Sequence, residues 1–259
     1  MSAAARRFDS WAEMQRSVES ELQAFEKRWT SPAAVPFFRG HSSTAFQLAP
    51  SLLRPASGRW YTSFDEANLY YEFRSQAGVL LPSEVDSWDL LFLMQHHGVP
   101  TRLLDWSESF AAALFFALGP KPDDIDIWFL DPYVFNKTTI GKEEILDLGA
   151  DLDQQYAAYF VDKTHSPEWQ DAVAIYPRRR SSRLARQAGT FTLHATRAPL
   201  ETLQHPGLIR FTLDAEAWND AHRYLQLAGI NEFALFPDLD GLAKLLRKRF
   251  MPVNSCQWP

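Results

Sequence analysis

The sequence predicts an α+β protein with a mixed or antiparallel sheet and flanking helices. Short apolar runs typical of strands are scattered among segments with helical spacing, without the regular strand–helix–strand rhythm of a doubly wound sheet. Of the 259 residues 46% are apolar and only 11 are glycines, which gives ample material for a core and little for flexible linkers. We therefore expect one elaborated domain.

Hydrophobic spacing and turn signals locate the elements. Helices are expected over 8–25, from 63 behind a Ser63–Glu66 capping box, from 86 or 87 up to Gly98, over 110–118 behind a Ser107 cap, over 215–228, and after 237–241 with Leu242, Leu245 and Leu246. Strands are expected at 35–41, 101–106, 124–130, 172–176, 190–195, 208–213 and 232–236. Residues 136–170 carry no clear pattern and are interpreted as an insertion.

Charge and composition exclude several classes of protein. With 26 basic and 32 acidic residues the net charge is −6, so the protein is no general nucleic-acid coat or polybasic membrane binder, and any basic surface must be local. The single cysteine, Cys256, excludes an internal disulfide framework and favours a reducing compartment. No apolar run reaches the roughly 20 residues of a membrane span. We expect a cytoplasmic protein that contacts no membrane.

The common catalytic motifs are missing. The sequence contains no phosphate-binding loop, no dinucleotide glycine motif, no HExxH and no GxSxG. His96 and His97 are adjacent, and neighbouring side chains on a helix point about 100° apart, so the two cannot face one ion. No metal site is predicted, and a capping or hydrogen-bonding role is the expectation for this pair.

Two segments bring charge to strand ends. Arg39 ends a buried apolar run, where it either closes the sheet with an ion pair or clamps an anion, and Gly40 permits close approach to the backbone. In the segment 101–107, Arg102 and Asp105 either pair with structural partners, or a helix N-terminus, the Ser107 hydroxyl and a nearby arginine form an anion seat. Both alternatives stay open on the residues alone.

Two further segments are candidates for function. Five arginines between 178 and 186, including Arg178, Arg179, Arg180 and Arg183, form either a solvated basic loop or a docking site for a polyanion. Late in the chain, Asp238 and Asp240 follow a proline turn, where capping of the last helix is the expected role of Asp238. Glu232 lies on a predicted strand, and it is the candidate carboxylate for stabilising a cationic sugar.

The motifs resemble the FRG-domain family, which is named after its Phe-Arg-Gly motif. The resemblance rests on Phe38-Arg39-Gly40, on the block QHHGVPTRLLDWS at 95–107 with the following ALFFA, on 183–191, and on LFPDLDGL at 235–242. It implies an FRG domain at 34–250 containing the 136–170 insertion, preceded by a helical extension at 1–33. The family is mostly bacterial and phage-associated, which implies a setting in phage defence.

A second resemblance, to the ADP-ribosyltransferase fold, bears on mechanism. Such folds hold NAD in a split sheet, with an arginine or histidine on the first core strand, a hydroxyl on the next strand before an alanine- and aromatic-rich helix, and a glutamate on a late strand. The resemblance implies that Arg39 clamps NAD together with Gly40 and His41. It also implies that Ser107 or Thr101, with Arg102, braces ribose and phosphates, and that Glu232 is catalytic, with Asp238 and Asp240 as rivals.

Three hypotheses follow for function. The first is a bacterial or phage-defence toxin that uses NAD to ADP-ribosylate a nucleic acid or protein, with Arg178, Arg179, Arg180 and Arg183 presenting the acceptor and an antitoxin as a candidate partner. The second is a non-catalytic domain that recognises a nucleotide or nucleic acid through the same arginines. The third is a hydrolase with His41 or His97 as base. It is the weakest of the three, because no oriented nucleophile accompanies either histidine.

Overall fold

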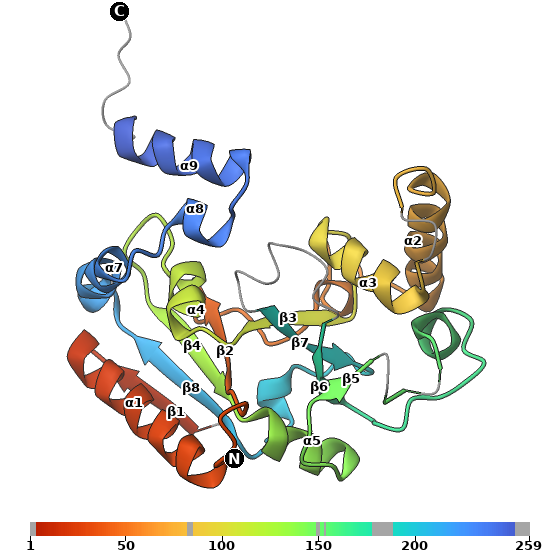
Figure 1. Cartoon of the computed structure of the whole chain (residues 1–259), viewed down its shortest axis with the longest axis horizontal. Coiled ribbons are helices and arrows are strands. Elements are labelled where there is room, and N and C mark those ends of the chain that lie inside the picture. Colours follow the sequence, from red (N-terminus) through yellow and green to blue (C-terminus); the bar gives the residue numbers. More distant parts are fainter. Residues whose placement is uncertain (1–3, 82–84, 149–150, 153, 178–188, 252–259) are drawn as a thin grey trace, which may run out of the picture.

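The computed structural model describes residues 4–81, 85–148, 151–152, 154–177 and 189–251, and its strands form one eight-stranded sheet in the order β1-β8-β4-β2-β3-β7-β6-β5 (Figure 1). The strands are β1 (Ala4–Phe8), β2 (Phe37–His41), β3 (Leu103–Ser107), β4 (Ile125–Leu130), β5 (Leu146–Asp147), β6 (Ala172–Tyr176), β7 (Gly189–His194) and β8 (Leu208–Leu213). The helices are α1 (Trp11–Arg28), α2 (Ser63–Gln76), α3 (Ser87–His96), α4 (Phe110–Ala117), α5 (Pro132–Ile140), α7 (Trp218–Leu227), α8 (Glu232–Leu235) and α9 (Leu239–Phe250). Short 3-10 turns lie at η1 (Ser51–Leu53), η3 (Leu200–Thr202) and η4 (Ala215–Ala217), and a π-helical turn lies at η2 (Ala157–Val161).

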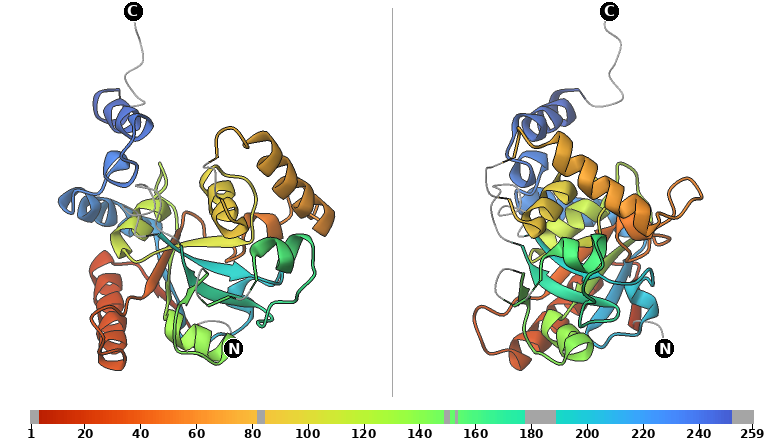
Figure 2. Two further views of the ribbon diagram at one scale, coloured as in Figure 1. Left: turned by 45° about the vertical axis from the view of Figure 1, so that its right-hand side comes forward. Right: turned by 90° about the vertical axis from the view of Figure 1, so that its right-hand side faces the viewer.

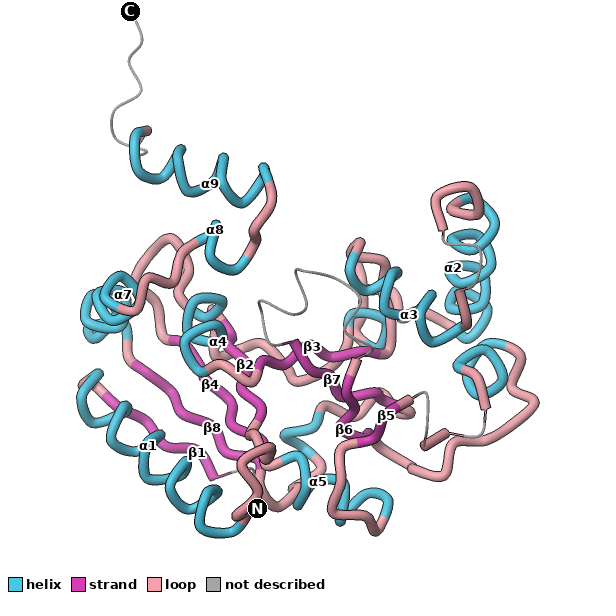
Figure 3. Tube along the Cα trace, viewed as in Figure 1, coloured by secondary structure: helices cyan, strands magenta, loops and turns pink. Residues whose placement is uncertain are grey.

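The sheet is mixed, as the scattered strand signals predicted. Its edge strands β1 and β5 run parallel to their neighbours β8 and β6, and the five inner pairings are antiparallel. Figure 3 shows the strands in two groups, with β1, β8, β4 and β2 on one side and β3, β7, β6 and β5 on the other. The groups meet at β2 and β3.

The two faces of the sheet carry separate hydrophobic clusters because side chains alternate along each strand. On β4, Ile125, Ile127 and Phe129 point to the face covered by α1, α4 and α7, whereas Trp128 and Leu130 point to the opposite face. The views in Figure 2 show α1 lying along the β1–β8–β4 half of the sheet. A third cluster joins α2, α3 and η2 to β3, β6 and β7.

Two sequence predictions about the ends and edges of the fold were wrong. Residues 1–33 contribute more than a helix, because Ala4–Phe8 forms the edge strand β1 paired with β8. Residues 232–236 form the short helix α8 and not a strand, because the Asn231 side chain accepts hydrogen bonds from the amides of Phe233 and Ala234 (3.0 Å each) and so begins a helical turn.

The helix caps also differ from prediction by one or two residues. The capping box of α2 is Thr62 with Asp65, one position before the expected pair. Ser107 is the last residue of β3, and Ser109 caps α4 by accepting from the amide of Ala112 (3.2 Å). The expected cap of α3, Asp86, is confirmed.

The 136–170 segment is joined to the sheet by buried polar contacts. The Asn136 side chain, fully buried on α5, donates to the carbonyl of Ala174 (2.9 Å) on β6 and accepts from the Ala174 amide (2.7 Å). A side-chain amide that satisfies both backbone groups of one residue acts as a substitute strand partner. This segment therefore completes the sheet through α5 and β5.

Candidate functional site

The candidate site lies where β2 and β3 diverge. These neighbours share a single register pair, Phe38 with Ser107, whereas β2 pairs with β4 over five residues and β3 pairs with β7 over five. A cavity of about 480 Å³ opens at this point. Its wall is formed by Phe38, Arg39 and Gly40 of β2, Asp105, Trp106 and Ser107 of β3, Gly189 and Phe191 of β7, Ala113 and Phe116 of α4, and Ser51, Gln95, His96, Gly98 and Val99.

Each residue of the Phe-Arg-Gly motif has a different place in this wall. The Phe38 ring is buried against Phe110 and Phe129, with ring centroids 5.7 and 5.5 Å apart. A Cβ on Gly40 would lie 1.9 Å from the carbonyl oxygen of Ala113, so only glycine lets α4 lie this close to β2. Between them, Arg39 lines the cavity. The motif therefore anchors a strand, admits a helix and presents one cation.

The Arg39 guanidinium bridges the diverging strands. Its Nη1 donates to the main-chain oxygen of Asp105, its Nε donates to Nε2 of His41 (3.1 Å), and the nearest carboxylate oxygen, Oδ2 of Asp105, is 4.0 Å away. Burial lowers the pKa of Arg39, and Arg54 lowers it further, while Asp105 raises it. A guanidinium stays charged in proteins and has five N–H donors. Two of them are used by His41 and Asp105, so the others can donate to an anion.

His41 lies behind Arg39. Burial lowers its pKa to about 3, and the charges of Arg39, Arg54 and Arg210 act in the same direction. The imidazole is therefore neutral at pH 7 and can accept from the Arg39 Nε through Nε2. His41 orients the arginine and is not part of the cavity wall.

Asp105 is the acidic residue in the described wall of the cavity. Its side chain is 59% exposed, and Oδ2 accepts a hydrogen bond from Nε2 of Gln95 (2.8 Å). The Gln95 Oε1 in turn accepts from the hydroxyl of Thr101. Thr101 is 1% exposed, so its hydroxyl serves this network and does not reach the cavity.

Ser107 closes the point of divergence. It is 6% exposed, lines the cavity, and its Oγ accepts from the amide of Ser109 (3.0 Å) just before α4. Gly189, the first residue of β7, is its strand partner. The structure thus brings Arg39, Gly40, Asp105 and Ser107 to one cavity.

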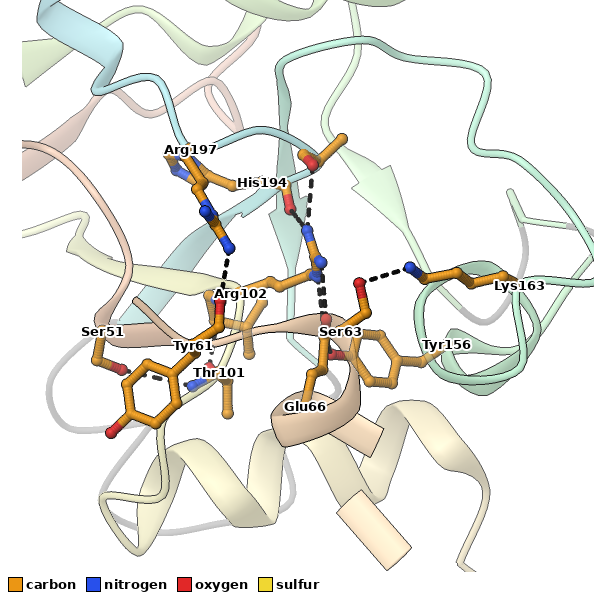
Figure 4. A network of polar contacts seen from close by, with 12 residues as sticks. Ser51, Tyr61, Ser63, Glu66, Thr101, Arg102, Tyr156, Lys163, His194 and Arg197 are labelled. Atoms are coloured by element: carbon orange, nitrogen blue, oxygen red, sulfur yellow. Dashed lines mark hydrogen bonds and ion pairs between the residues drawn. The ribbon is translucent and has the colours of Figure 1, made fainter. Parts of the chain in front are cut away.

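Arg102 is not in this site, because its side chain points into a buried ionic network (Figure 4). Its Nε and Nη2 donate to the two oxygens of Glu66 (2.5 and 2.7 Å), and Nη1 donates to the carbonyls of His194 and Ala195. Glu66 also accepts from the hydroxyl of Tyr156 (2.7 Å). Glu66 raises the pKa of Arg102 against the opposing effect of burial, and the arrangement joins α2 to β3 and η2.

The expected late carboxylate is elsewhere. Glu232 on α8 pairs with Nζ of Lys248 (3.1 Å) and is not among the described residues of the cavity wall. Asp238 caps α9 by accepting from the amide of Gly241 (2.7 Å), and Asp240 is exposed in the first turn of that helix. Capping therefore explains Asp238. Arg178, Arg179, Arg180 and Arg183 lie outside the described residues.

Sequence reasoning missed two contributors to the cavity. Gln95 belonged to a recognised motif, but spacing could not show that its amide faces Asp105. Phe116 lines the cavity, and its ring meets Phe236 edge to face, with centroids 6.0 Å apart. The run Ala113–Ala117 indicated a buried helix and gave no sign that one of its aromatic rings, 43% exposed, borders a cavity.

The described residues offer neither a metal site nor a membrane span. No group of three or more His, Cys, Asp or Glu residues within them could hold a metal ion. The rings of His96 and His97 are nearly perpendicular, with an interplanar angle of 87°. Within the same part of the chain, no helix has the length and apolar character to cross a bilayer.

Comparison with known families now identifies the central part of the chain. The family model described as FRG domain matches residues 35–124, which include β2, α2, α3, β3 and α4. The chain carries an FRG domain there, and this confirms the expectation drawn from Phe38-Arg39-Gly40 and the 95–107 motif. The match covers two of the three cavity-forming strands, β2 and β3. No curated protein and no solved structure matches the chain.

Proposed function

We propose that the chain binds NAD in the cavity between β2 and β3 and acts as an ADP-ribosyltransferase. The observation that carries the proposal is the divergence of these strands around the Arg39 guanidinium, beyond the one register pair of Phe38 with Ser107. An arginine on one strand, a hydroxyl on the next and a following alanine-rich helix agree with the resemblance to ADP-ribosyltransferases. The cavity of about 480 Å³ is within the roughly 300–1,000 Å³ typical of small-molecule sites.

Each polar group of the wall has a role in this proposal. The planar fork of Arg39 suits the pyrophosphate oxygens of NAD, because a guanidinium can donate two parallel hydrogen bonds to such a group. Ser107 lies at the closed end of the divergence, where its hydroxyl can contact the nicotinamide ribose. Asp105 adds a negative charge to the same wall, with its Oδ2 4.0 Å from Nη1 of Arg39.

The reaction breaks the glycosidic bond between nicotinamide and ribose. The bonding electron pair leaves with nicotinamide, and the sugar carbon acquires positive character that a nearby carboxylate stabilises electrostatically. A nucleophile of the acceptor then bonds to this carbon and loses its proton. Asp105 is our candidate for the carboxylate, in place of Glu232, because Asp105 lines the cavity with Arg39 and Glu232 is paired with Lys248.

Nicotinamide release and NAD affinity, measured together, test the proposal. Asp105→Asn should lower the rate of nicotinamide release about 100-fold and change the NAD dissociation constant little, because the interaction strengthens in the transition state. Glu232→Gln and Asp240→Asn are matched controls that should keep wild-type turnover. Full turnover by Asp105→Asn, or loss of turnover only in Glu232→Gln, would contradict the assignment.

A second candidate function is recognition of a nucleotide without turnover. The observation that favours it is that no acidic residue of α8 or α9 is in the described cavity wall, and that Asp105 is itself engaged by Gln95 and close to Arg39. Under this alternative, NAD binds saturably, and no nicotinamide is released with or without nucleic acid or protein acceptors.

The proposal also includes the class of acceptor and the biological setting. The arginines at 178, 179, 180 and 183 favour a polyanionic acceptor such as a nucleic acid, whose modification would weaken as salt screens the contact. The family resemblance favours a bacterial toxin of phage defence, with an antitoxin as partner. Turnover assays should therefore include nucleic acid as well as protein acceptors.

A further inference from the structure

The side-chain amide of Gln95 is held by a hydrogen bond at each end. Its Oε1 accepts from the Thr101 hydroxyl, and its Nε2 donates to Oδ2 of Asp105 (2.8 Å). We propose that Gln95 is a positioning residue that orients the Asp105 carboxylate in the cavity. This inference rests on the proposed function, in which Asp105 is the carboxylate that faces the sugar.

The orientation of the Gln95 amide follows from the contacts of Thr101. The Thr101 Oγ1 accepts from the amide of Leu103 (3.1 Å), so its proton is directed to the remaining neighbour, Oε1 of Gln95. With the amide oxygen fixed at Thr101, the NH₂ group must face Asp105. The Leu103 amide thus fixes the direction of the hydrogen bonds from Thr101 to Gln95 and from Gln95 to Asp105, which we call the Thr101–Gln95–Asp105 relay.

The Thr101–Gln95–Asp105 relay holds the Asp105 side chain, which would otherwise be free to rotate. Asp105 is 59% exposed, and an exposed aspartate changes rotamer readily. Gln95 takes one lone pair of Oδ2, and Arg39 Nη1 lies 4.0 Å from the same oxygen. Among the described residues nothing donates to Oδ1, which leaves that oxygen to accept from a ligand hydroxyl.

The fold brings these three positions of the 95–107 segment together. Helix α3 ends at His96, and Gly98 has a positive φ of 75°, so the chain reverses at His97 and Gly98, just beyond Gln95. The reversal brings Thr101 back beside the last turn of α3 and starts β3, which carries Asp105. The glutamine, the threonine and the aspartate therefore form one structural unit.

Replacement of Gln95 by methionine tests the inference, because methionine keeps the size and removes both hydrogen bonds. We expect Gln95→Met to lower kcat for nicotinamide release about 100-fold with little change in KM, since a misdirected carboxylate affects the transition state more than NAD binding. The control is Gln76→Met, which removes a surface glutamine that likewise donates to a carboxylate, Glu72 (2.9 Å). A kcat of Gln95→Met equal to that of the control would overturn the inference.

Replacement by glutamate gives a signature that a purely structural role would not produce. In Gln95→Glu, Thr101 still donates to one oxygen, while the other oxygen faces Oδ2 of Asp105 and can approach it only when the two carboxyl groups share a proton. Activity relative to wild type at the same pH should therefore recover as pH falls toward about 5. Activity of Gln95→Met relative to wild type should not recover, and equal pH profiles of the two variants would contradict the inference.

A double-mutant cycle separates this inference from the proposed function. If Gln95 acts through Asp105, the double variant of Gln95→Met and Asp105→Ala should be no worse than Asp105→Ala alone. The cycle is measured in kcat when the wild-type protein releases nicotinamide. When the wild type releases no nicotinamide, the proposed reaction is wrong. The same cycle measured in the free energy of unfolding then decides whether Gln95 holds Asp105, with additive effects overturning the inference.

Discussion

Arg39 and Arg102 are both arginines of the FRG-domain motifs, and their surroundings are opposite. Arg102 meets both oxygens of Glu66, two main-chain carbonyls and the face of Phe160, whose ring centroid is 4.6 Å away. Arg39 meets one carbonyl, one imidazole, and a carboxylate at 4.0 Å that is largely exposed. Arg102 lies in solid packing, whereas Arg39 faces a cavity.

The comparison separates a structural cation from a candidate ligand-binding cation. A buried charge is stabilised by its partners, so an arginine with a complete set of partners is committed to the fold. An arginine whose nearest carboxylate is distant and exposed can bind an anion without breaking a short ion pair. The sequence alone left both arginines open to either role, and their contacts now distinguish them.

The largest effect is expected where the partners are complete. Glu66→Gln removes the charge that neutralises Arg102 and leaves a buried guanidinium without a counterion, so the free energy of unfolding should fall by about 3–5 kcal/mol. Urea unfolding followed by tryptophan fluorescence measures this. The control is Glu72→Gln on the exposed side of α2, which should change stability by less than about 0.5 kcal/mol. Equal effects of the two variants would show that the network around Arg102 is not structural.

A pH series sharpens the comparison, because a buried histidine accompanies each arginine. His41 accepts from Arg39, and the main-chain carbonyl of His194 accepts from Arg102; burial lowers the pKa of each imidazole to about 3. Below the unfolded pKa of about 6.5 the unfolded chain takes up protons that the folded chain does not, so stability is lost as pH falls from that value toward 3. Each histidine should contribute about 1.4 kcal/mol per pH unit over most of this range.

Unfolding free energies measured between pH 7 and pH 5 test that expectation, because the lowered pKa values of Asp65 and Asp124 act only at more acid pH. His205 and His222 also have pKa values lowered by burial and add to the loss, whereas burial raises the pKa of Glu201, which acts in the opposite direction. His41→Gln keeps an acceptor for Arg39 and removes one titrating histidine. The free energy of unfolding should therefore fall by about 1.4 kcal/mol less per pH unit than in the wild type. Constant stability from pH 7 to 5 would contradict neutral, buried histidines beside the arginines.

Much of the central fold could be predicted from the sequence, because local signals there agree with tertiary packing. The Phe38-Arg39-Gly40 strand, the Asp86 cap of α3 and the alternation in β4 all have local causes that spacing reveals. The prediction that Arg39 ends this strand was wrong, because β2 continues to His41, which pairs with Asp126 of β4. Strands β2 and β4 lie in the middle of the sheet, next to the site.

The predictions that failed depended on partners far away in the sequence or on a single capping residue. Nothing near Arg102 indicates that Glu66, 36 residues earlier, accepts hydrogen bonds from its Nε and Nη2. The run after Asn231 is short and apolar, and periodicity cannot distinguish a strand from a helical turn at that length. The Asn231 cap favoured the helix, and with it Glu232 pairs with Lys248 of α9.

The central claim is that Arg39 is available to an anionic nucleotide, and NAD binding by calorimetry tests it most directly. Arg39→Lys keeps the charge and removes the planar fork, so NAD affinity should fall at least about tenfold, while the free energy of unfolding changes by less than about 1 kcal/mol. The surface variant Arg59→Lys is the control and should bind as the wild type does. Wild-type NAD affinity in Arg39→Lys, or no NAD binding by the wild-type protein, would contradict the account.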